Sequence, residues 1–333
     1  MGSRLPIMFF ISHCPDKRTT HGSWGPSFGL LLAFAGVGTA CAPSRDSVTA
    51  VERIHPEVSE RFAEYWRDGL ADVSVYRLQQ PRYGEVRTGE AVWITVTEPF
   101  DPDALVKRDN MARPYREVLK LNDIRSFETG VYDYRTMSST FVPTGTQTPL
   151  KVSTSVQEWC GHVYEELRWR DTGIERTVHS YFETEQRAAE VLPTPRDGWT
   201  EDAFPLVMRR SGGEPGLAPG EVRDIQWLPA RVGSRLRGDD GRWRAATLRR
   251  SATPSIRETP DGEVAVEVWS VTTGEEVHRW FVEAAWPHGV VGWERSDGER
   301  GDRVGAERID YWVRQSSDDA TIRTSLGLPV QRE

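Results

Sequence analysis

The stretch that decides the fold runs from Leu150 to Glu183 and reads LKVSTSVQEWCGHVYEELRWRDTGIERTVHSYFE. Apolar and polar residues alternate along it, and Asp171-Thr172-Gly173 interrupts the alternation with turn-forming residues. Successive side chains of a β-strand point to opposite faces, so a period of two favours strands. The stretch therefore predicts two long antiparallel strands joined at residues 171–173.

The same period of two returns through most of the chain after residue 72. A turn at Gly238-Asp239-Asp240-Gly241 is expected to join two of these strands into a hairpin. Further strands are expected at 73–78, 83–96, 115–121, 127–141, 222–228, 231–237, 243–249, 264–271, 277–284, 290–295 and 308–315.

Few helices interrupt the strands. An apolar stripe at i, i+4, i+7 and i+8 predicts a short helix over 56–68. Shorter helices are expected at 186–192, at 201–210 and from Asp318 or Asp319 onward. No helix of crossover length separates the strands, which argues against a parallel sheet. We expect a mainly β fold: a large antiparallel sheet curled into a barrel or half-barrel, or a sandwich, with a short N-terminal helix and a few short connecting helices.

The N-terminus has the features of a secretory signal. Lys17 and Arg18 precede an apolar run over 28–37, and small residues follow that run. The run is too short to span a bilayer. We therefore expect residues 1–40 to be a signal peptide.

The end of this segment, Gly38-Thr39-Ala40-Cys41, resembles the lipobox of bacterial lipoproteins. The resemblance implies a lipid on Cys41, which would attach the protein to a membrane; the alternative is ordinary cleavage with Cys41 as a plain thiol. Residues 41–55 are then a tether. Residues 56–333 form a single β-rich domain, with a subdivision near the low-complexity stretch 211–220.

Composition narrows the function classes. Without residues 1–40, which hold three basic residues and one acidic residue, the chain has a net charge of −10. This balance argues against nucleic-acid binding. Only four of the 42 basic residues are lysine, a bias that an Arg-rich codon usage explains. With Cys41 lipidated, Cys160 has no intramolecular partner, so the core and not a disulfide framework must hold the domain.

The segment Gln157-Glu158-Trp159-Cys160-Gly161-His162 is the main candidate for catalysis. On one strand Glu158, Cys160 and His162 share a face, and a thiol beside an imidazole and a carboxylate resembles a nucleophile with its base. Their Cα atoms would lie about 6.6 Å apart with parallel side chains, unless Gly161 forms a bulge. The alternative is an ordinary small, apolar cysteine within the sheet. We favour the alternative and assign no catalytic residue.

No metal site or cofactor is expected. With the hairpin turn at Thr172-Gly173, His162 pairs with Glu183 and His179 pairs with Glu166. The two histidines then lie about 13 Å apart along the ladder, too far to bind one zinc ion. A register shifted by one residue would place the two histidines on opposite faces.

Eight arginines lie between residues 223 and 250, with tryptophans among them. Arginine and tryptophan at a hairpin turn suit an anionic surface such as lipid head groups. A solvated strand face explains the same pattern. The candidates for anionic contact are Arg235, Arg237, Arg242, Trp243 and Arg244. Glycine-rich nucleotide-binding motifs and a serine-hydrolase elbow are absent from the sequence.

Several segments between about residue 60 and residue 230 stand out together. They are Tyr83-Gly-Glu before AVWITVTE, Val118-Leu-Lys-Leu-Asn122, Thr129-Gly-Val-Tyr-Asp-Tyr134, Met137-Ser-Ser-Thr-Phe141, Ser155-Val-Gln-Glu-Trp-Cys-Gly-His162 and Ser180-Tyr-Phe-Glu183. Together they resemble an uncharacterised family of bacterial lipoproteins, sometimes labelled septum formation inhibitor Maf. True Maf proteins are cytoplasmic nucleotide pyrophosphatases, and their Ser-Pro-Arg-Arg motif is missing here, so that activity is not carried over.

These observations favour a non-enzymatic lipoprotein, exported and anchored to the outer membrane facing the periplasm. It would bind an apolar or envelope-derived ligand, or an envelope protein. One alternative is a Cys-dependent envelope enzyme that uses Cys160 with His162 or Glu158. Another is a structural or adhesive surface protein.

Overall fold

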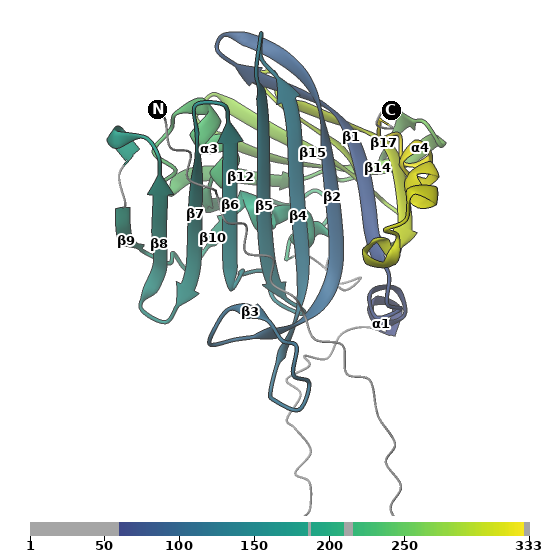
Figure 1. Cartoon of the computed structure of the whole chain (residues 1–333), viewed down its shortest axis with the longest axis horizontal. Coiled ribbons are helices and arrows are strands. Elements are labelled where there is room, and N and C mark those ends of the chain that lie inside the picture. Colours follow the sequence, from purple (N-terminus) through teal and green to yellow (C-terminus); the bar gives the residue numbers. More distant parts are fainter. Residues whose placement is uncertain (1–59, 186–187, 210–215, 330–333) are drawn as a thin grey trace, which may run out of the picture. The chain divides into compact units, whose positions relative to one another are not determined.

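The strands form one large sheet whose neighbours run mostly antiparallel (Figure 1). The computed structural model describes residues 60–185, 188–209 and 216–329; the expected signal peptide, Cys41 and the tether lie outside them. The strands are β1 Ala71–Arg82, β2 Glu85–Asp101, β3 Val106–Lys107, β4 Arg116–Glu128, β5 Asp133–Pro143, β6 Lys151–Glu158, β7 Gly161–Arg170, β8 Gly173–Ser180, β9 Ala188–Leu192, β10 Gly198–Thr200, β11 Val222–Leu228, β12 Arg244–Arg250, β13 Ser255–Thr259, β14 Gly262–Thr273, β15 Glu276–Glu283, β16 Val290–Arg295 and β17 Arg300–Ile309.

The helices of the described residues are short. The α-helices are α1 Glu60–Trp66, α2 Phe204–Met208, α3 Arg231–Arg237 and α4 Thr321–Ser325. The 3-10 helices are η1 Glu183–Glu185, η2 Glu201–Ala203, η3 Tyr311–Val313 and η4 Ser317–Ala320. None of the helices in the described ranges has the length and apolar character needed to cross a membrane.

Across the sheet the strands follow the order β9, β8, β7, β6, β5, β4, β2, β1, β17, β16, β15, β14, β12, β11 and β10. β3 pairs with the end of β2, and β13 pairs with β14 beside β12. The short β10–β11 pair is parallel, and the other pairs are antiparallel. The expected mainly β fold with a large antiparallel sheet is confirmed.

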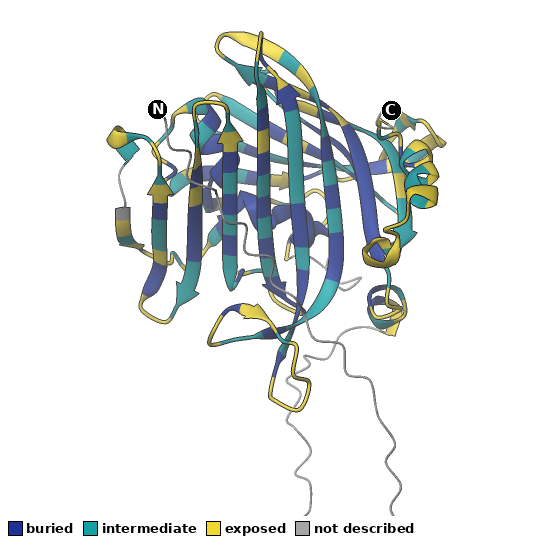
Figure 2. Cartoon of the chain, viewed as in Figure 1, coloured by how far each residue is buried: buried dark blue, intermediate teal, exposed yellow. Residues whose placement is uncertain are grey.

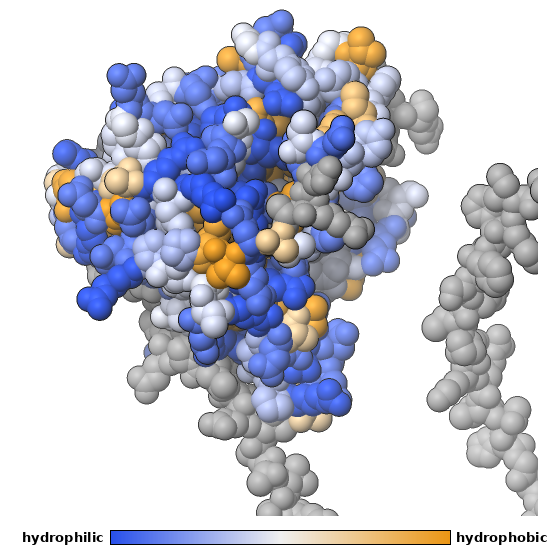
Figure 3. Space-filling model, turned by 90° about the vertical axis from the view of Figure 1, so that its left-hand side faces the viewer, coloured by the Kyte–Doolittle hydropathy of each residue, from blue (hydrophilic) through white to orange (hydrophobic). Residues whose placement is uncertain are grey.

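The sheet curls so that its two halves face each other. In Figure 1, β2 and β4 to β9 form the front layer, and β12, β14 and β15 cross behind it. The edge strands β9 and β10 are consecutive in the chain but do not pair, so the sheet is not closed. Side chains bridge this seam: Arg242 pairs with Glu190 at 2.6 Å, and the Trp243 indole donates to the Pro193 carbonyl at 2.9 Å. Figure 3 shows that side of the molecule, mainly hydrophilic around a hydrophobic patch.

Alternation along the strands separates an inner face from an outer face. In β4, Leu119 and Leu121 are almost completely buried in the core, while Lys120 between them lies on the outer face. Figure 2 shows the resulting bands of buried and less buried residues along the front strands. The period of two in the sequence thus arises because one face of the sheet packs on the core and the other face is open to solvent.

Aromatic side chains fill the space between the two layers. Trp93 of β2 and Trp293 of β16 stack with ring centroids 4.8 Å apart, which joins the front layer to the back layer. Phe204 of α2 meets Trp227 and Trp280 edge-on, at 5.4 and 4.8 Å. The helix α2 is therefore part of the core, although the sequence identifies it only as a short connection.

The stretch Leu150–Glu183 forms three strands, not the expected two. β6 and β7 join at Trp159-Cys160, residues that carry no turn signal of their own. Gly161 permits this turn, because a Cβ there would lie 2.5 Å from the ring of Tyr181. The next turn is Asp171-Thr172, and His179 pairs with Tyr164 instead of the expected Glu166. The register is therefore two residues away from the predicted one.

Three other segments differ from expectation. Residues 231–237 form the helix α3 and not a strand: Val232 and Leu236, one turn apart, are both buried, and Gly238 ends the helix at φ 72°. The expected hairpin turn at 238–241 is thus a helix end and a loop. Where a helix was expected over 186–192, β9 extends the sheet beside β8. The strand expected at 308–315 lies earlier, as β17.

Candidate functional site

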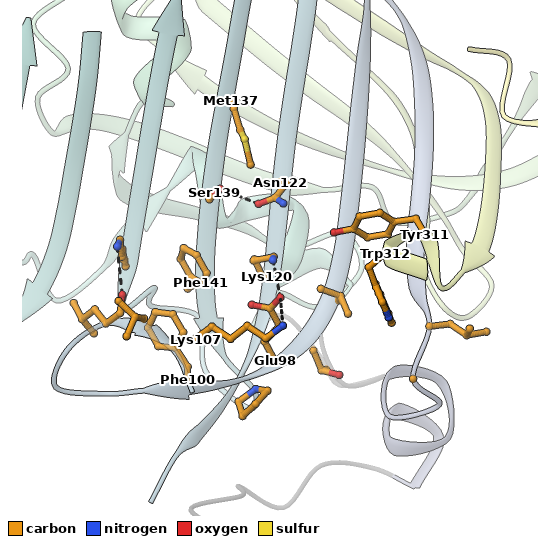
Figure 4. Close-up of a pocket in the computed structure, with 18 residues that line it drawn as sticks. Glu98, Phe100, Lys107, Lys120, Asn122, Met137, Ser139, Phe141, Tyr311 and Trp312 are labelled. Atoms are coloured by element: carbon orange, nitrogen blue, oxygen red, sulfur yellow. Dashed lines mark hydrogen bonds and ion pairs between the residues drawn. The ribbon is translucent and has the colours of Figure 1, made fainter. Parts of the chain in front are cut away.

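A groove crosses the outer face of β2, β4 and β5 at the lower end of the front layer (Figure 4). Its volume is about 630 Å³, within the range of small-molecule sites. Strand alternation places the lining side chains: in β5, Met137, Ser139 and Phe141 point into the groove, while Ser138 and Thr140 between them are buried on the inner face. The segment around β3 forms one wall, and Tyr311 and Trp312 of η3 form another.

Apolar side chains make up much of the groove. Phe100 and Phe141 stack with centroids 4.8 Å apart at its lower end. Val106 is 50% exposed and Trp312 42% exposed, so their apolar surfaces remain open to an incoming group. Apolar residues left open at a concave surface are typical of binding sites.

All three lysines of the described residues, Lys107, Lys120 and Lys151, line this groove. Lys120 Nζ lies 2.6 Å and Lys107 Nζ 3.9 Å from the same Glu98 carboxylate oxygen. One carboxylate therefore faces two ammonium groups, which leaves a positive charge beside the apolar walls.

The third lysine is also only partly neutralised. Lys151 Nζ lies 2.8 Å from Glu166 and donates to the Leu105 carbonyl at 3.3 Å. Arg168 binds the same Glu166 carboxylate. Burial opposes ionisation, but Lys151, Tyr164 and Arg168 together hold the pKa of Glu166 below its ordinary value. The groove thus combines apolar surface with an excess of cationic groups.

The inner face also has a hollow of about 510 Å³, lined by Glu165, Arg176 and Val178 with residues of α3. In this hollow Arg176 and Arg231 both pair with Glu165.

A smaller cavity on the inner face, about 30 Å³, lies among Trp93, Arg125, Asp202 and His278 and has room for about one water molecule. Arg125 beside it pairs with Asp123 at 2.9 Å and with Glu299 at 2.8 Å. Glu201 lies 3.0 Å from Arg295 and 3.1 Å from His278, and these contacts hold its pKa well below the ordinary value although burial raises it.

Cys160 belongs neither to the candidate cluster nor to the interior of the sheet, where the favoured alternative placed it. It lies exposed at the β6–β7 turn, where its backbone N–H donates to the Glu158 carboxylate at 2.9 Å. Glu158 and His162 stand on different strands, and His162 pairs with Gln157. The prediction that the three side chains share one face of one strand is therefore wrong. A hydrogen bond between the thiol itself and the Glu158 carboxylate, together with the negative charge of that carboxylate, raises the pKa of the Cys160 thiol.

The histidines also lie differently from expectation. His179 pairs with Tyr164, so the two histidines are two positions apart along the ladder and share a face. No group of three His, Cys, Asp or Glu side chains suited to a metal ion occurs in the described parts of the chain.

The predicted anionic-contact residues lie on α3, β12 and the loop between them. Each of the four arginines has a carboxylate partner: Glu185 for Arg235, Asp239 for Arg237 and Arg244, and Glu190 for Arg242. Trp243 is held by the Pro193 carbonyl. Fewer free guanidinium groups face solvent here than the sequence count implies.

Sequence reasoning missed the lysine-lined groove. The available signal was the scarcity of lysine, since three of its four positions fall on the outer faces of β3, β4 and β6. Comparison of the chain with protein-family models, with curated proteins and with solved structures found no match.

Proposed function

We propose that this protein is a non-enzymatic binding protein of the cell envelope, anchored through a lipid on Cys41, whose outer groove takes an amphiphile with an acidic head group. The observation that supports this proposal is the meeting of Lys107, Lys120 and Lys151 beside open apolar walls. A lysine ammonium is a compact charge that suits carboxylate or phosphate oxygens. The adjacent Phe141, with its neighbours, suits an acyl chain.

Location and anchoring rest on the sequence. The signal-like segment at 1–40 and the Gly-Thr-Ala-Cys ending support export and lipidation. Delivery to the outer membrane, facing the periplasm, would place the groove where fatty acids and other acidic lipids occur. A Cys41→Ala variant that stayed in the membrane fraction would refute the anchor.

Binding is tested with palmitate on the purified full chain by isothermal titration calorimetry. Hexadecanol, which has the same chain without the charge, measures the contribution of the lysines. The test variant carries Lys107→Gln, Lys120→Gln and Lys151→Gln. Its control carries Arg279→Gln and Arg300→Gln, two cations outside the groove that are each paired with a carboxylate.

We expect saturable palmitate binding, weaker hexadecanol binding, and a loss of palmitate affinity of about tenfold or more in the lysine variant only. Palmitate binding that the lysine variant leaves unchanged, or that both variants weaken equally, would contradict the groove as the site. Failure of all tested acyl anions to bind would contradict the ligand class.

A further inference from the structure

The β1–β2, β4–β5 and β6–β7 turns lie at the opposite end of the front layer (Figure 1). Residues in and beside these turns line a second hollow. We call it the rim pocket. Its volume is about 270 Å³. The residues that line it are Arg82, Tyr83, Tyr132, Tyr134, Val156, Glu158, Cys160, Gly161, Phe182, Glu185, Arg235 and Leu236.

Aromatic side chains stand open around this pocket. Trp159 is 73% exposed, Tyr181 70% and Tyr83 58%, and these are the most exposed aromatic side chains of the described residues. The ring of Trp159 lies 6.5 Å from that of Tyr132 inside the pocket. Of the three exposed rings, Tyr83 lines the pocket, and Trp159 and Tyr181 each lie against the ring of a lining residue, Tyr132 and Phe182. Exposed apolar rings gathered beside a hollow are typical of binding surfaces.

The floor of the pocket is polar and preorganised. Arg82 donates to the Leu236 carbonyl at 2.6 Å and to the Tyr134 hydroxyl at 3.0 Å. The Tyr83 hydroxyl lies 2.8 Å from that of Tyr134 and accepts from Tyr132 at 3.2 Å. These hydroxyls and the guanidinium provide fixed hydrogen-bond donors and acceptors next to the exposed rings.

The backbone at Tyr83 is held in an unfavourable conformation. Its φ is 56°, in the left-handed region that Asn and Gly adopt more readily, and Gly84 follows at φ 75°. This conformation brings the Tyr83 ring to 4.2 Å from the Arg82 guanidinium. Positive φ at both residues is the geometry of the two-residue turn that joins β1 to β2, and this turn fixes Tyr83 beside the pocket.

The charges of the rim pocket balance. Arg235 is paired with Glu185. Arg82 and Glu158 lack ion-pair partners among the described residues, and they contribute one positive and one negative charge. A strongly anionic or cationic ligand would meet one repulsive group, so a neutral ligand with many hydroxyl groups is favoured.

We propose that the rim pocket binds a neutral saccharide. A sugar ring has C–H groups on its faces, which pack on Trp and Tyr rings, and hydroxyls on its edge, which suit the Arg82, Glu158 and tyrosine groups. The site goes beyond the proposed acyl-binding function and uses none of the groove residues. A flat membrane surface fits less well, because the polar floor would lie unfilled beneath the rings.

The test uses tri-N-acetylglucosamine, cellotriose and maltotriose on the full chain, with calorimetry as the readout. Trp159→Ala and Tyr181→Ala are the test variants, since both side chains are exposed and their removal spares the core. Trp312→Ala, an exposed tryptophan of the outer groove, is the matched control. Palmitate is titrated into the same three variants.

We expect at least one trisaccharide to bind saturably, with affinity lowered about tenfold by Trp159→Ala and unchanged by Trp312→Ala. Palmitate affinity should be lowered by Trp312→Ala and unchanged by Trp159→Ala and Tyr181→Ala. The saccharide proposal and the acyl-binding proposal can therefore fail independently of each other. Absence of saturable binding of all three sugars overturns the proposal. So does loss of phosphatidylglycerol-vesicle binding in Trp159→Ala without any sugar binding, which would make the rim a membrane contact.

Discussion

The inner and outer faces of β4 and β5 are formed by alternate residues of the same strands, but the charged side chains near the two faces differ in burial and in how they are paired. On the inner face, Ser138 donates to Asp202 at 3.0 Å, and the nearby carboxylates and guanidinium groups are buried. On the outer face, Lys107 and Lys120 share the single carboxylate of Glu98. Charges that are fully paired inside a core hold the fold, whereas an excess of one sign beside open apolar surface is available to a ligand.

The largest effect should follow from breaking a buried pair. Glu201→Ala leaves His278 without its carboxylate and Arg295 with only the longer contacts to Glu276 and Asp297, which should cost about 3 kcal/mol of unfolding free energy. The outer-face counterpart is Glu98→Ala, with a smaller expected cost of about 1–2 kcal/mol, because Lys120 keeps access to the groove. Urea unfolding at pH 7 measures both. Equal losses for the two variants would remove the distinction between the faces.

Two neighbouring residues of β4 sharpen the same comparison. Leu121→Ala should destabilise the protein by about 2–5 kcal/mol, because Leu121 is buried among the core residues. Lys120→Ala should cost only about 1–2 kcal/mol, since Lys107 remains beside Glu98, but it should weaken palmitate binding. A Lys120→Ala variant as unstable as Leu121→Ala would assign the lysine a structural role.

A third test uses pH. Burial raises the pKa of Asp202 to about 7, although Arg231 lowers it, whereas its ordinary value is 3.8. Because the folded state holds the proton more tightly, the contribution of Asp202 is present below 3.8 and is lost as pH rises towards about 7. Asp202→Asn removes this loss. The variant should gain on the order of 2 kcal/mol or more over the wild type at pH 8 and nothing at pH 3.5.

The control for the pH test is Asp240→Asn, an exposed carboxylate for which a gain of about 0.5 kcal/mol or less is expected. A constant difference between Asp202→Asn and the wild type from pH 3.5 to pH 8 would show that Asp202 does not carry a proton in the folded protein.

The smallest effect concerns Cys160. Because the thiol is exposed but its pKa is raised by Glu158, iodoacetamide should modify it no faster than a free cysteine at pH 7. Cys160→Ser should leave unfolding free energy and palmitate binding unchanged. Modification much faster than that of free cysteine would revive the Cys-dependent enzyme.

The period of two predicted much of the fold. β11 and β16 begin and end at the expected residues, because each is a run of apolar alternation bounded by turn or loop residues. The sequence did not predict α3, because Val232 and Leu236 are four residues apart. That spacing puts both side chains on one face of a helix and also on one face of a strand. The β6–β7 turn was missed since Trp159 and Cys160 are not turn formers, and only packing of Tyr181 on Gly161 reveals it.

The candidate sites were less predictable than the fold. The segments around Tyr83, Tyr132 and Cys160 were each identified, but their meeting at the rim pocket depends on the order of the strands. The lysines were counted, yet nothing in their spacing of 13 and 31 residues indicates a shared groove.

The sequence by itself determined which side chains face the core, because alternation is a local property of a strand. Only the tertiary structure decided which outward-facing side chains lie together, because strand order, register and curl are set by contacts between residues far apart in the chain. Leu150–Glu183 shows both: its alternation predicted strands, and its pairing with distant segments placed Cys160 at the rim and Lys151 in the groove.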